Sequence, residues 1–308
     1  MDILITGVNG FLGRALAKSL IKSNHKVIGI GRQNTCKVSG VEYHKIDLSI
    51  PQDLSHIIKK CEIIYHLAAI TAHNDIVNNT LETEKISLLS TRNLLIPIIN
   101  DKNSKIFIFA STGKVYGNFD SLPLIESSKA SPINLLGKIK RKTEILINEK
   151  SNSKDSFFIL RIFNVYGPMQ KESFVIPTII KQLIKQKSKS KYFRLTLGDI
   201  EAKRDYIFID DVIELFAKIS KRSLNLKGTT FVNVGSGYGR SVKDIISYIE
   251  DVLQKEIITK IDNNKLRSDE LDIEYSSIRK ANQLFDWHPQ VTLKNGINFI
   301  LKHYGLVD

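Results

Sequence analysis

The sequence is short of cysteine and of long apolar runs. Its 308 residues include two cysteines, Cys36 and Cys61, which are too few for a disulfide framework and whose spacing fits no zinc site. No apolar run reaches the roughly 18 residues that a membrane-spanning helix needs. The opening residues lack a basic leader and a small-residue cleavage site. We therefore expect a protein of the cytoplasm, with no membrane and no metal.

Arginine is also scarce. It supplies 11 of the 45 basic residues, so the net charge of +13 is carried mostly by lysine spread along the chain. Recognition of phosphates and base edges favours clustered arginine. The densest basic run, 138–142, lies inside a helical pattern and is typical of a solvated face. We therefore expect no nucleic-acid partner.

Apolar runs of strand length alternate with helical patterns through the first half of the chain. Uninterrupted apolar strands separated by helices predict a parallel sheet covered on both faces, in an α/β doubly wound (Rossmann) arrangement. The expected strands are Asp2–Thr6, Lys26–Ile30, Val41–Ile46, Glu62–His66, Lys105–Ala110 and Ser156–Phe163. The expected helices include Phe11–Lys22, Gln52–Lys60, Glu82–Ile99 and Leu135–Asn148.

The second half is less regular and predicts a smaller mixed C-terminal domain. Its strands are shorter, and the boundary falls near Tyr166–Pro168, after the sixth strand. We expect a dinucleotide-binding domain over 1–165, with segments around 200–235 returning to it, and a second domain over 166–308. Expected elements are strands Arg194–Leu197, Thr230–Asn233 and Ile257–Lys260, and helices Phe174–Gln186, Asp210–Ser220, Val242–Leu253 and Leu293–His303.

A glycine-rich turn joins the first strand to the first helix. Gly7, Gly10 and Gly13 are spaced three apart, and Phe11 and Leu12 open the helical pattern. Glycine permits positive φ and lets backbone amides approach a pyrophosphate, which the helix N-terminus favours. The alternative is a plain tight turn. In this position the pattern indicates a dinucleotide site.

A second glycine pair, Gly29 and Gly31, ends the second strand, but neither a third glycine nor a helix follows it. An NAD site usually places an acidic residue there for the ribose 2′-hydroxyl. This chain has Gly31 and then Arg32, which would suit a 2′-phosphate. We therefore favour NADP over NAD, while an exposed loop arginine remains the alternative.

Further segments, in order along the chain, resemble the extended short-chain dehydrogenases/reductases of the NAD-dependent epimerase/dehydratase type. The resemblance covers nearly the whole chain. The matching pieces are the glycine turn, Asp47-Leu48, His66-Leu67-Ala68-Ala69, Ser111-Thr112 with Val115-Tyr116-Gly117, Arg161 through Pro168, Arg204-Asp205-Tyr206 with Asp210-Asp211-Val212, Asn233 through Gly237, and Trp287 with Pro289.

The resemblance implies ligands and roles: a nicotinamide dinucleotide, a nucleotide-diphosphate sugar and a homodimer through the two long helices. Asp47 and Leu48 would flank the adenine, and Leu67, Ala68 and Ala69 would line the cofactor channel. Thr112 would bond the reacting sugar oxygen. Asn164, Arg204 and Arg267 would contact the sugar diphosphate, although Arg204 could instead pair with Asp210 or Asp211.

The family's catalytic pair is Tyr-x-x-x-Lys on a helix, where the lysine favours the phenolate that exchanges a proton with the sugar. Here Lys140 matches the lysine, with Glu144 after it, and Leu136 stands at the tyrosine position. No tyrosine occurs between Tyr116 and Tyr166. Loss of a general acid–base costs on the order of 10²–10⁴ in rate. Lys140 could still bond the nicotinamide ribose, or be a solvated helix lysine.

Two functional readings follow. The first is an NAD(P)-dependent nucleotide-sugar epimerase or ketoreductase for polysaccharide precursors, with Thr112 and Lys140 as the remaining catalytic residues. The second is a pseudoenzyme that binds cofactor and nucleotide-sugar without turnover. Gly113 and Lys114 stand where sugar 4,6-dehydratases carry an acidic pair, which argues against that reaction.

Overall fold

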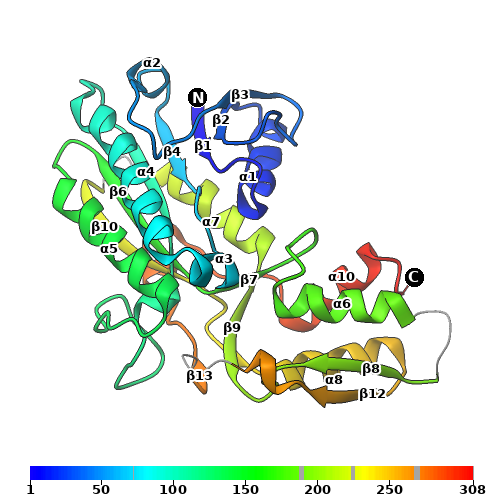
Figure 1. The fold of residues 1–308 in the computed structure, drawn as a ribbon. Helices are drawn as coiled ribbons and strands as arrows, with labels where there is room; N and C mark the ends of the chain where they lie inside the picture. Colours follow the sequence, from blue (N-terminus) through cyan, green and yellow to red (C-terminus); the bar gives the residue numbers. More distant parts are fainter. Residues whose placement is uncertain (72, 187–190, 223–225, 267–270, 308) are drawn as a thin grey trace.

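The computed structural model describes residues 1–71, 73–186, 191–222, 226–266 and 271–307. A seven-stranded sheet forms its larger part, in the order β10-β6-β5-β4-β1-β2-β3, and all six pairings are parallel (Figure 1). The strands are β1 (Asp2–Thr6), β2 (Lys26–Gly31), β3 (Val41–Lys45), β4 (Ile63–His66), β5 (Ile106–Thr112), β6 (Ser156–Ile162) and β10 (Gly228–Val234). The predicted doubly wound parallel sheet is confirmed.

Alternation along the strands gives the sheet two cores. In β5, Ile106 and Ile108 belong to one buried cluster, and Phe107 and Phe109 belong to the other. The first cluster packs under α1 (Phe11–Lys22) and α7 (Ile209–Arg222). The second lies under α2 (Ser55–Ile58), α4 (Thr80–Asn100) and α5 (Leu135–Lys150). Because side chains alternate with period two, continuous apolar runs cover both faces.

A second, smaller set of elements lies beside the carboxyl ends of the large sheet (Figure 1). β9 (Lys203–Phe208) pairs with β7 (Asn164–Tyr166), β11 (Gly239–Arg240) and β13 (Ile273–Glu274), while β8 (Phe193–Leu197) pairs with β12 (Ile257–Ile261). The remaining helices are α3 (His73–Asn78), α6 (Val175–Gln186), α8 (Val242–Leu253), α9 (Arg279–Phe285) and α10 (Leu293–His303), with short 3-10 turns η1 (Gly113–Val115) and η3 (Asn263–Lys265).

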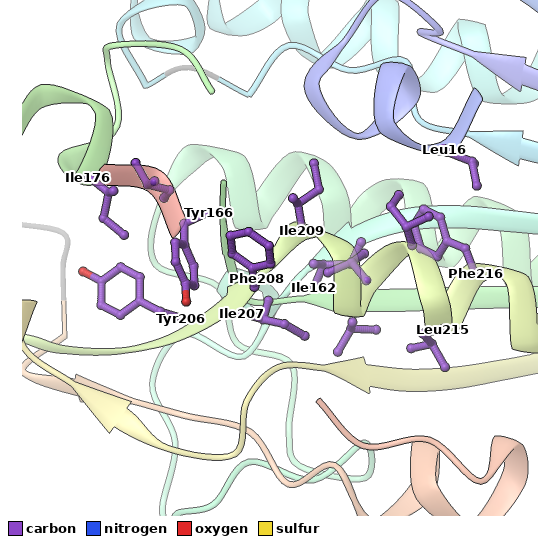
Figure 2. Packing of buried hydrophobic residues seen from close by; sticks show 14 of the residues in the cluster. Leu16, Ile162, Tyr166, Ile176, Tyr206, Ile207, Phe208, Ile209, Leu215 and Phe216 are labelled. Atoms are coloured by element: carbon purple, nitrogen blue, oxygen red, sulfur yellow. The ribbon is translucent and has the colours of Figure 1, made fainter. Parts of the chain in front are cut away.

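One continuous core joins the two parts. Figure 2 shows Ile176 of α6, Tyr166 of β7 and Phe208 of β9 packed in line with Phe216 of α7 and Leu16 of α1. Tyr166 and Phe208 meet edge to face, with ring centroids 5.4 Å apart. Aromatic pairs in this geometry stabilise a fold beyond the area that they bury. The small sheet is therefore held against the seven-stranded sheet by one buried cluster that contains side chains of both.

Several details differ from the sequence predictions, and the short elements α3, α9, β11 and β13 were not predicted. The helix expected over Gln52–Lys60 is wrong in extent, since only Ser55–Ile58 is helical and Asp53 accepts the Ser55 amide in a preceding turn. Strands β7 and β9 were not predicted. No helix among the described residues is long and apolar enough to cross a membrane.

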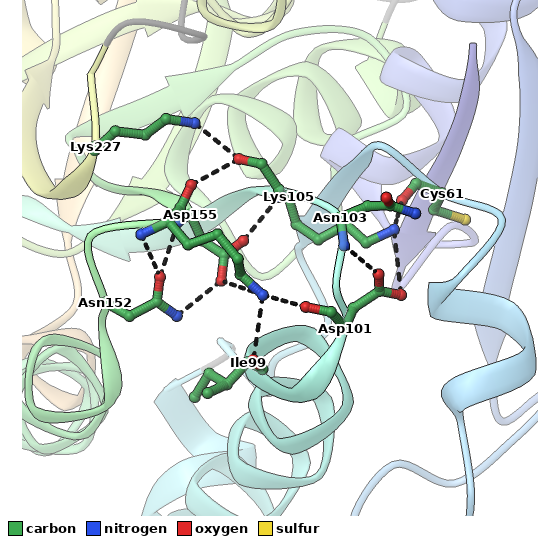
Figure 3. Close-up of polar contacts among 10 residues, drawn as sticks. Cys61, Ile99, Asp101, Asn103, Lys105, Asn152, Asp155 and Lys227 are labelled. Carbon is green, nitrogen blue, oxygen red and sulfur yellow. Dashed lines mark hydrogen bonds and ion pairs between the residues drawn. The ribbon is translucent and has the colours of Figure 1, made fainter.

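A polar cluster closes the amino ends of β5 and β6 (Figure 3). The Lys105 ammonium donates to the Cys61 carbonyl at 2.8 Å and lies 3.5 Å from the Asp101 carboxylate. Lys154 donates to the carbonyls of Ile99 and Asp101 at the C-terminus of α4. Cations are favoured at that end of a helix. The cluster therefore fixes where α4 ends and β5 begins.

Candidate functional site

The glycine turn lies at the carboxyl end of β1, between β1 and α1. Gly7 has φ +68°, and a Cβ there would lie 2.8 Å from the backbone of Ala68. A Cβ on Gly13 would lie 2.3 Å from the carbonyl oxygen of Gly7. Both distances are shorter than real Cβ contacts, so the fold itself requires these two glycines.

Gly10 differs from the other two. It is exposed, and a Cβ there would meet only the Gly7 oxygen, at 3.0 Å, among the described atoms within 4 Å. Gly10 is also the N-cap of α1 and, as a glycine, has no side chain that could cap the helix. The first N–H groups of α1, at Phe11, Leu12 and Gly13, have no intrahelical acceptor. The turn thus presents an open helix N-terminus, and these residues fit a pyrophosphate.

A buried hydrogen-bond chain braces this turn. The Ala68 amide donates to Thr6 Oγ1, which lies 2.8 Å from His66 Nδ1, and His66 Nε2 lies 3.0 Å from Thr91 Oγ1. Thr91 donates onward to the Ser87 carbonyl, so its oxygen accepts a hydrogen bond from His66 Nε2, which carries a proton. Burial lowers the pKa of His66 to about 3, with a smaller effect from the Lys140 charge. The chain therefore holds the 67–69 segment beside Gly7.

The expected adenosine side lies at the ends of β2 and β3. Asp47 accepts hydrogen bonds from the amide and hydroxyl of Ser49, which lower the pKa of its carboxyl, and the Arg32 charge lowers it further. Arg32 is exposed, and Leu48 is buried. Asn9 of the glycine turn binds the carbonyl of Thr35 and the amide of Lys37. The loop that carries Arg32 is therefore tied to the glycine turn.

Thr112, which the sequence predicts to be a catalytic residue, is the last residue of β5. Its Oγ1 accepts from the Lys114 amide at 3.3 Å. Gly113 has no room for a side chain, because a Cβ would lie 2.8 Å from the Phe163 ring. A Cβ on Gly137, the residue after Leu136, would lie 2.3 Å from the Lys114 carbonyl oxygen. The first turn of α5 is therefore pressed against η1, and Leu136 is partly exposed beside it.

Lys140 lies one helical turn after Leu136 and is buried. Its ammonium donates to the Ala110 carbonyl at 2.6 Å and sits 4.5 Å from the centre of the Phe109 ring. Burial lowers the pKa of Lys140 to about 8, against a weaker opposing effect of Glu144. The alternative of a solvated helix lysine is wrong.

Glu144 and Arg161 form a buried ion pair behind this edge. Arg161 donates to both carboxylate oxygens, at 3.1 and 3.0 Å, and the Ser111 hydroxyl donates at 2.6 Å. Arg161 also lies 4.8 Å from the centre of the Tyr116 ring, whose hydroxyl donates to Asn233. A bidentate guanidinium–carboxylate pair fixes the geometry of both partners. These groups anchor α5 to the sheet.

The small sheet supplies the other side of the site. The side-chain amide nitrogen of Asn164 is buried and has no hydrogen-bond partner among the described residues. An unpartnered buried donor costs about 1–3 kcal/mol, so this nitrogen is available to a ligand. Arg204 of β9 is buried and lies in register with Glu274 of β13.

The described contacts do not bear out the alternative that Arg204 pairs with the acidic residues of α7. The Asp211 carboxylate accepts the amides of Gln290 and Val291, and no ion pair between Arg204 and either Asp210 or Asp211 is found in the described parts of the chain. Arg267 lies outside the described residues. In those residues no group of three His, Cys, Asp or Glu side chains could hold a metal ion.

Some site residues were not predicted. The two hydrogen-bond partners of His66 come from separate segments, Thr6 of β1 and Thr91 of α4. Lys114 forms an ion pair with Glu274, 3.2 Å apart and 160 residues away. The sequence did offer one indication that Lys114 belongs to the site. Lys114 follows Thr112 by two residues, which places a cation at the carboxyl edge of β5.

Comparison with known proteins decides the family. The profile of the family described as GDP-mannose 4,6 dehydratase matches residues 4–300. The chain belongs to this family. Its members and structural neighbours are extended short-chain dehydrogenases/reductases that act as NAD-dependent nucleotide-sugar epimerases and dehydratases. The resemblance inferred from the sequence motifs is thereby confirmed.

Individual relatives span the whole chain. An uncharacterized UDP-glucose epimerase of Bacillus subtilis is 28% identical, over 96% of both chains. A GDP-6-deoxy-D-mannose reductase of Pseudomonas aeruginosa is 26% identical, over 98% of this chain and 96% of its own. The UDP-glucuronic acid 4-epimerase of Bacillus cereus, solved with UDP-glucuronic acid and NAD, is 27% identical with a TM-score of 0.86, over 99% of both chains.

Proposed function

We propose that this family member is an NAD(P)-dependent nucleotide-sugar epimerase or ketoreductase that makes precursors of polysaccharides in the cytoplasm. The observation that carries the proposal is the open turn at Gly10, where the N-terminus of α1 is exposed at the carboxyl edge of the parallel sheet. Ligands of open α/β sheets bind at this edge. Relatives named as an epimerase and a reductase support the same class of reaction.

The roles of the two halves follow from that placement. Residues 1–165, with the returning 200–235 segment, would hold the dinucleotide, and residues 166–308 the nucleotide-sugar. The glycine turn would take the pyrophosphate, and Ala68 with Ala69 would border the nicotinamide, while Asn164 and Arg204 would contact the sugar diphosphate, with Arg267 as their partner. When bound, the dinucleotide supplies or accepts a hydride.

NADP is the dinucleotide that the end of β2 favours. Gly31 leaves no carboxylate to accept a 2′-hydroxyl, and a Cβ there would lie 3.0 Å from the Tyr43 hydroxyl. The exposed Arg32 could pair with a 2′-phosphate. Titration with NADPH and NADH tests the preference. Tighter binding of NADPH that is lost in Arg32→Ala supports it, and equal affinity in the unaltered protein contradicts it.

Product analysis tests the reaction itself. The purified chain is mixed with UDP-, GDP- and CDP-linked hexoses or 4-keto hexoses and either dinucleotide, and the sugars are separated by chromatography. Interconversion of 4-epimers, or consumption of NADPH with a 4-keto sugar, supports the proposal. Tight binding of both ligands with no change in any sugar contradicts it.

Leu136 favours a second candidate, a binding protein without turnover. A leucine at the tyrosine position cannot carry a proton, and it lies partly exposed on the first turn of α5. Leu136→Tyr separates the two functions. Activity that appears only in the tyrosine variant favours the binding protein, whereas activity of the unaltered chain favours the enzyme.

We also propose a homodimer through α4 and α5. Apolar side chains remain exposed on these helices, including Leu81, Ile96 and Ile145. Exposed apolar patches of this kind mark interfaces. Light scattering at micromolar concentration tests it: a dimer that Ile96→Glu converts to a monomer supports the proposal, and a monomeric unaltered chain contradicts it.

A further inference from the structure

Four proton-carrying side chains lie on or next to η1 and α5, the two elements that meet beside Leu136, and three of them are poorly placed to serve as an acid. The Tyr116 hydroxyl donates to Asn233 at 2.6 Å, and burial raises its pKa to about 12. Lys140 is buried and donates to the Ala110 carbonyl. The hydroxyl of Thr112 is a very weak acid. Lys114 is the fourth.

Lys114 lies in η1, which packs against the first turn of α5, where Leu136 is found. Its amide donates to Thr112, and its carbonyl packs on Gly137, the neighbour of Leu136. Its ammonium is 3.2 Å from the carboxylate of Glu274, with side-chain exposures of 18% and 3%. The ion pair runs from the carboxyl edge of the large sheet to β13 of the small sheet. It therefore spans the two layers between which we place the sugar.

We propose that Lys114 is the proton donor of a reductive reaction, with Glu274 as its positioning residue. This rests on the proposed function and narrows it to reduction of a nucleoside-diphosphate 4-keto hexose. The carbonyl carbon gains a hydride from a reduced nicotinamide dinucleotide, which is oxidised, and the C=O π electrons move to oxygen. That oxygen forms an O–H bond with a proton from Lys114 Nζ, whose N–H electron pair stays on nitrogen. The amine then takes a proton from water.

Charged groups near Lys114 come from three neighbouring elements. Its 3-10 turn packs on α5 and β6, which carry Lys140, Glu144 and Arg161, and its partner Glu274 lies in register with the buried Arg204 of β9. Glu144 is held by Arg161, so Glu274 is the carboxylate that stabilises the Lys114 ammonium. A charged acid suits reduction, since the alcohol-oxidising direction would need a neutral base at the same atom.

Steady-state reduction of a nucleoside-diphosphate 4-keto-6-deoxyhexose by NADPH tests the proposal in three variants. Lys114→Met removes the acid, and Lys114→Arg keeps the ion pair but cannot release a proton. We expect kcat to fall at least about 100-fold in both. The KM for the sugar and the NADPH affinity should stay within about threefold. The exposed Lys138→Met is the matched control and should keep full kcat.

Glu274→Gln keeps the shape of the partner but removes the carboxylate that lies 3.2 Å from the Lys114 ammonium. We expect kcat to fall at least about tenfold while the KM for the sugar and the NADPH affinity stay within about threefold, a split that a merely structural pair would not give. A Lys114→Arg variant with kcat within threefold of the unaltered chain overturns Lys114 as the donor. An unaltered chain that epimerises sugars but reduces none overturns the reductive direction while leaving the proposed function standing.

Discussion

The two ends of the seven-stranded sheet use polar side chains in opposite ways. At the amino ends, Lys105 binds a carbonyl group of its own chain in the polar cluster of Figure 3, and Lys154 binds the Ile99 carbonyl. At the carboxyl ends, the helix N-terminus behind Gly10 is open, and the Asn164 amide nitrogen has no hydrogen-bond partner among the described residues. Buried atoms without a hydrogen bond also occur at the amino ends, at Asp101 Oδ2 and Thr229 Oγ1, so the open helix N-terminus is what distinguishes the carboxyl ends. We therefore expect ligands at the carboxyl ends.

The largest expected effect separates two glycines of the same turn. Gly13→Ala should lower the free energy of unfolding by about 3 kcal/mol, because its Cβ would lie 2.3 Å from the Gly7 carbonyl oxygen and 2.9 Å from Val8 Cα. The added Cβ of Gly10→Ala would lie 3.0 Å from the Gly7 carbonyl oxygen, so this variant should lose less than about 1 kcal/mol of unfolding free energy. Its affinity for the dinucleotide should fall at least about tenfold. Urea unfolding and calorimetric titration measure both quantities. Equal losses of stability would contradict the distinction.

The next effect depends on pH and on His66. The unfolded chain protonates His66 as the pH falls below 6.5, whereas the folded chain keeps it neutral down to about 3. Stability should therefore fall with decreasing pH across this window, by about 2 kcal/mol between pH 6.5 and 5.

His66→Gln removes the titrating group and leaves hydrogen-bonding atoms for Thr6 and Thr91. Its unfolding free energy should change less between pH 6.5 and 5 than that of the unaltered chain. Urea denaturation at a series of pH values measures the difference. Parallel pH curves for the two proteins would show that His66 is not a buried neutral group.

A smaller loss of stability is expected for a substitution at the amino end of the sheet. Lys154→Met removes the cation that caps the C-terminus of α4 and should cost about 1–2 kcal/mol. NADPH affinity should not change, since the residue lies at the end opposite to Gly10. The exposed Lys102→Met serves as the control and should keep the stability of the unaltered chain. A loss of NADPH affinity in Lys154→Met would break the division between the two ends.

The smallest change in stability is expected at Asn164. Because the amide nitrogen has no partner among the described residues, Asn164→Ala breaks no hydrogen bond of that atom, and the relief of its burial offsets the lost packing. Asn164→Ala should therefore lower the free energy of unfolding by no more than about 1 kcal/mol. Affinity for the nucleotide-sugar should fall about tenfold. Thermal unfolding and competition binding with a UDP-sugar give the two numbers. A large loss of stability with unchanged sugar affinity would make Asn164 a structural residue.

The large sheet was predictable because its strands are uninterrupted apolar runs and its first turn needs glycine. β9 was not, because Arg204 and Asp205 interrupt its apolar pattern. Asp205 is buried there, where Ser236 and Ser276 donate to its carboxylate and burial raises its pKa. Such pairing depends on residues distant in sequence, so no local pattern signals it.

The features of the candidate site also fall into those that the local sequence predicts and those that depend on distant segments. The glycine turn, and Leu136 four residues before Lys140, can be read from the local sequence. The ion pair of Lys114 with Glu274 and the chain through His66 join separate segments, and they become visible only when the strands are assembled. The burial of Lys140 likewise follows from the packing of α5 on β5, although it lies in a charged stretch of sequence.

The central claim is that the open turn at Gly10 holds the pyrophosphate of a nicotinamide dinucleotide. Isothermal titration of the unaltered chain and of Gly10→Val with NADPH tests it directly. We expect saturable binding of one dinucleotide per chain, absent in the valine variant, with both proteins unfolding at similar urea concentrations. Binding that survives the valine, or no binding by the unaltered chain, would contradict the account.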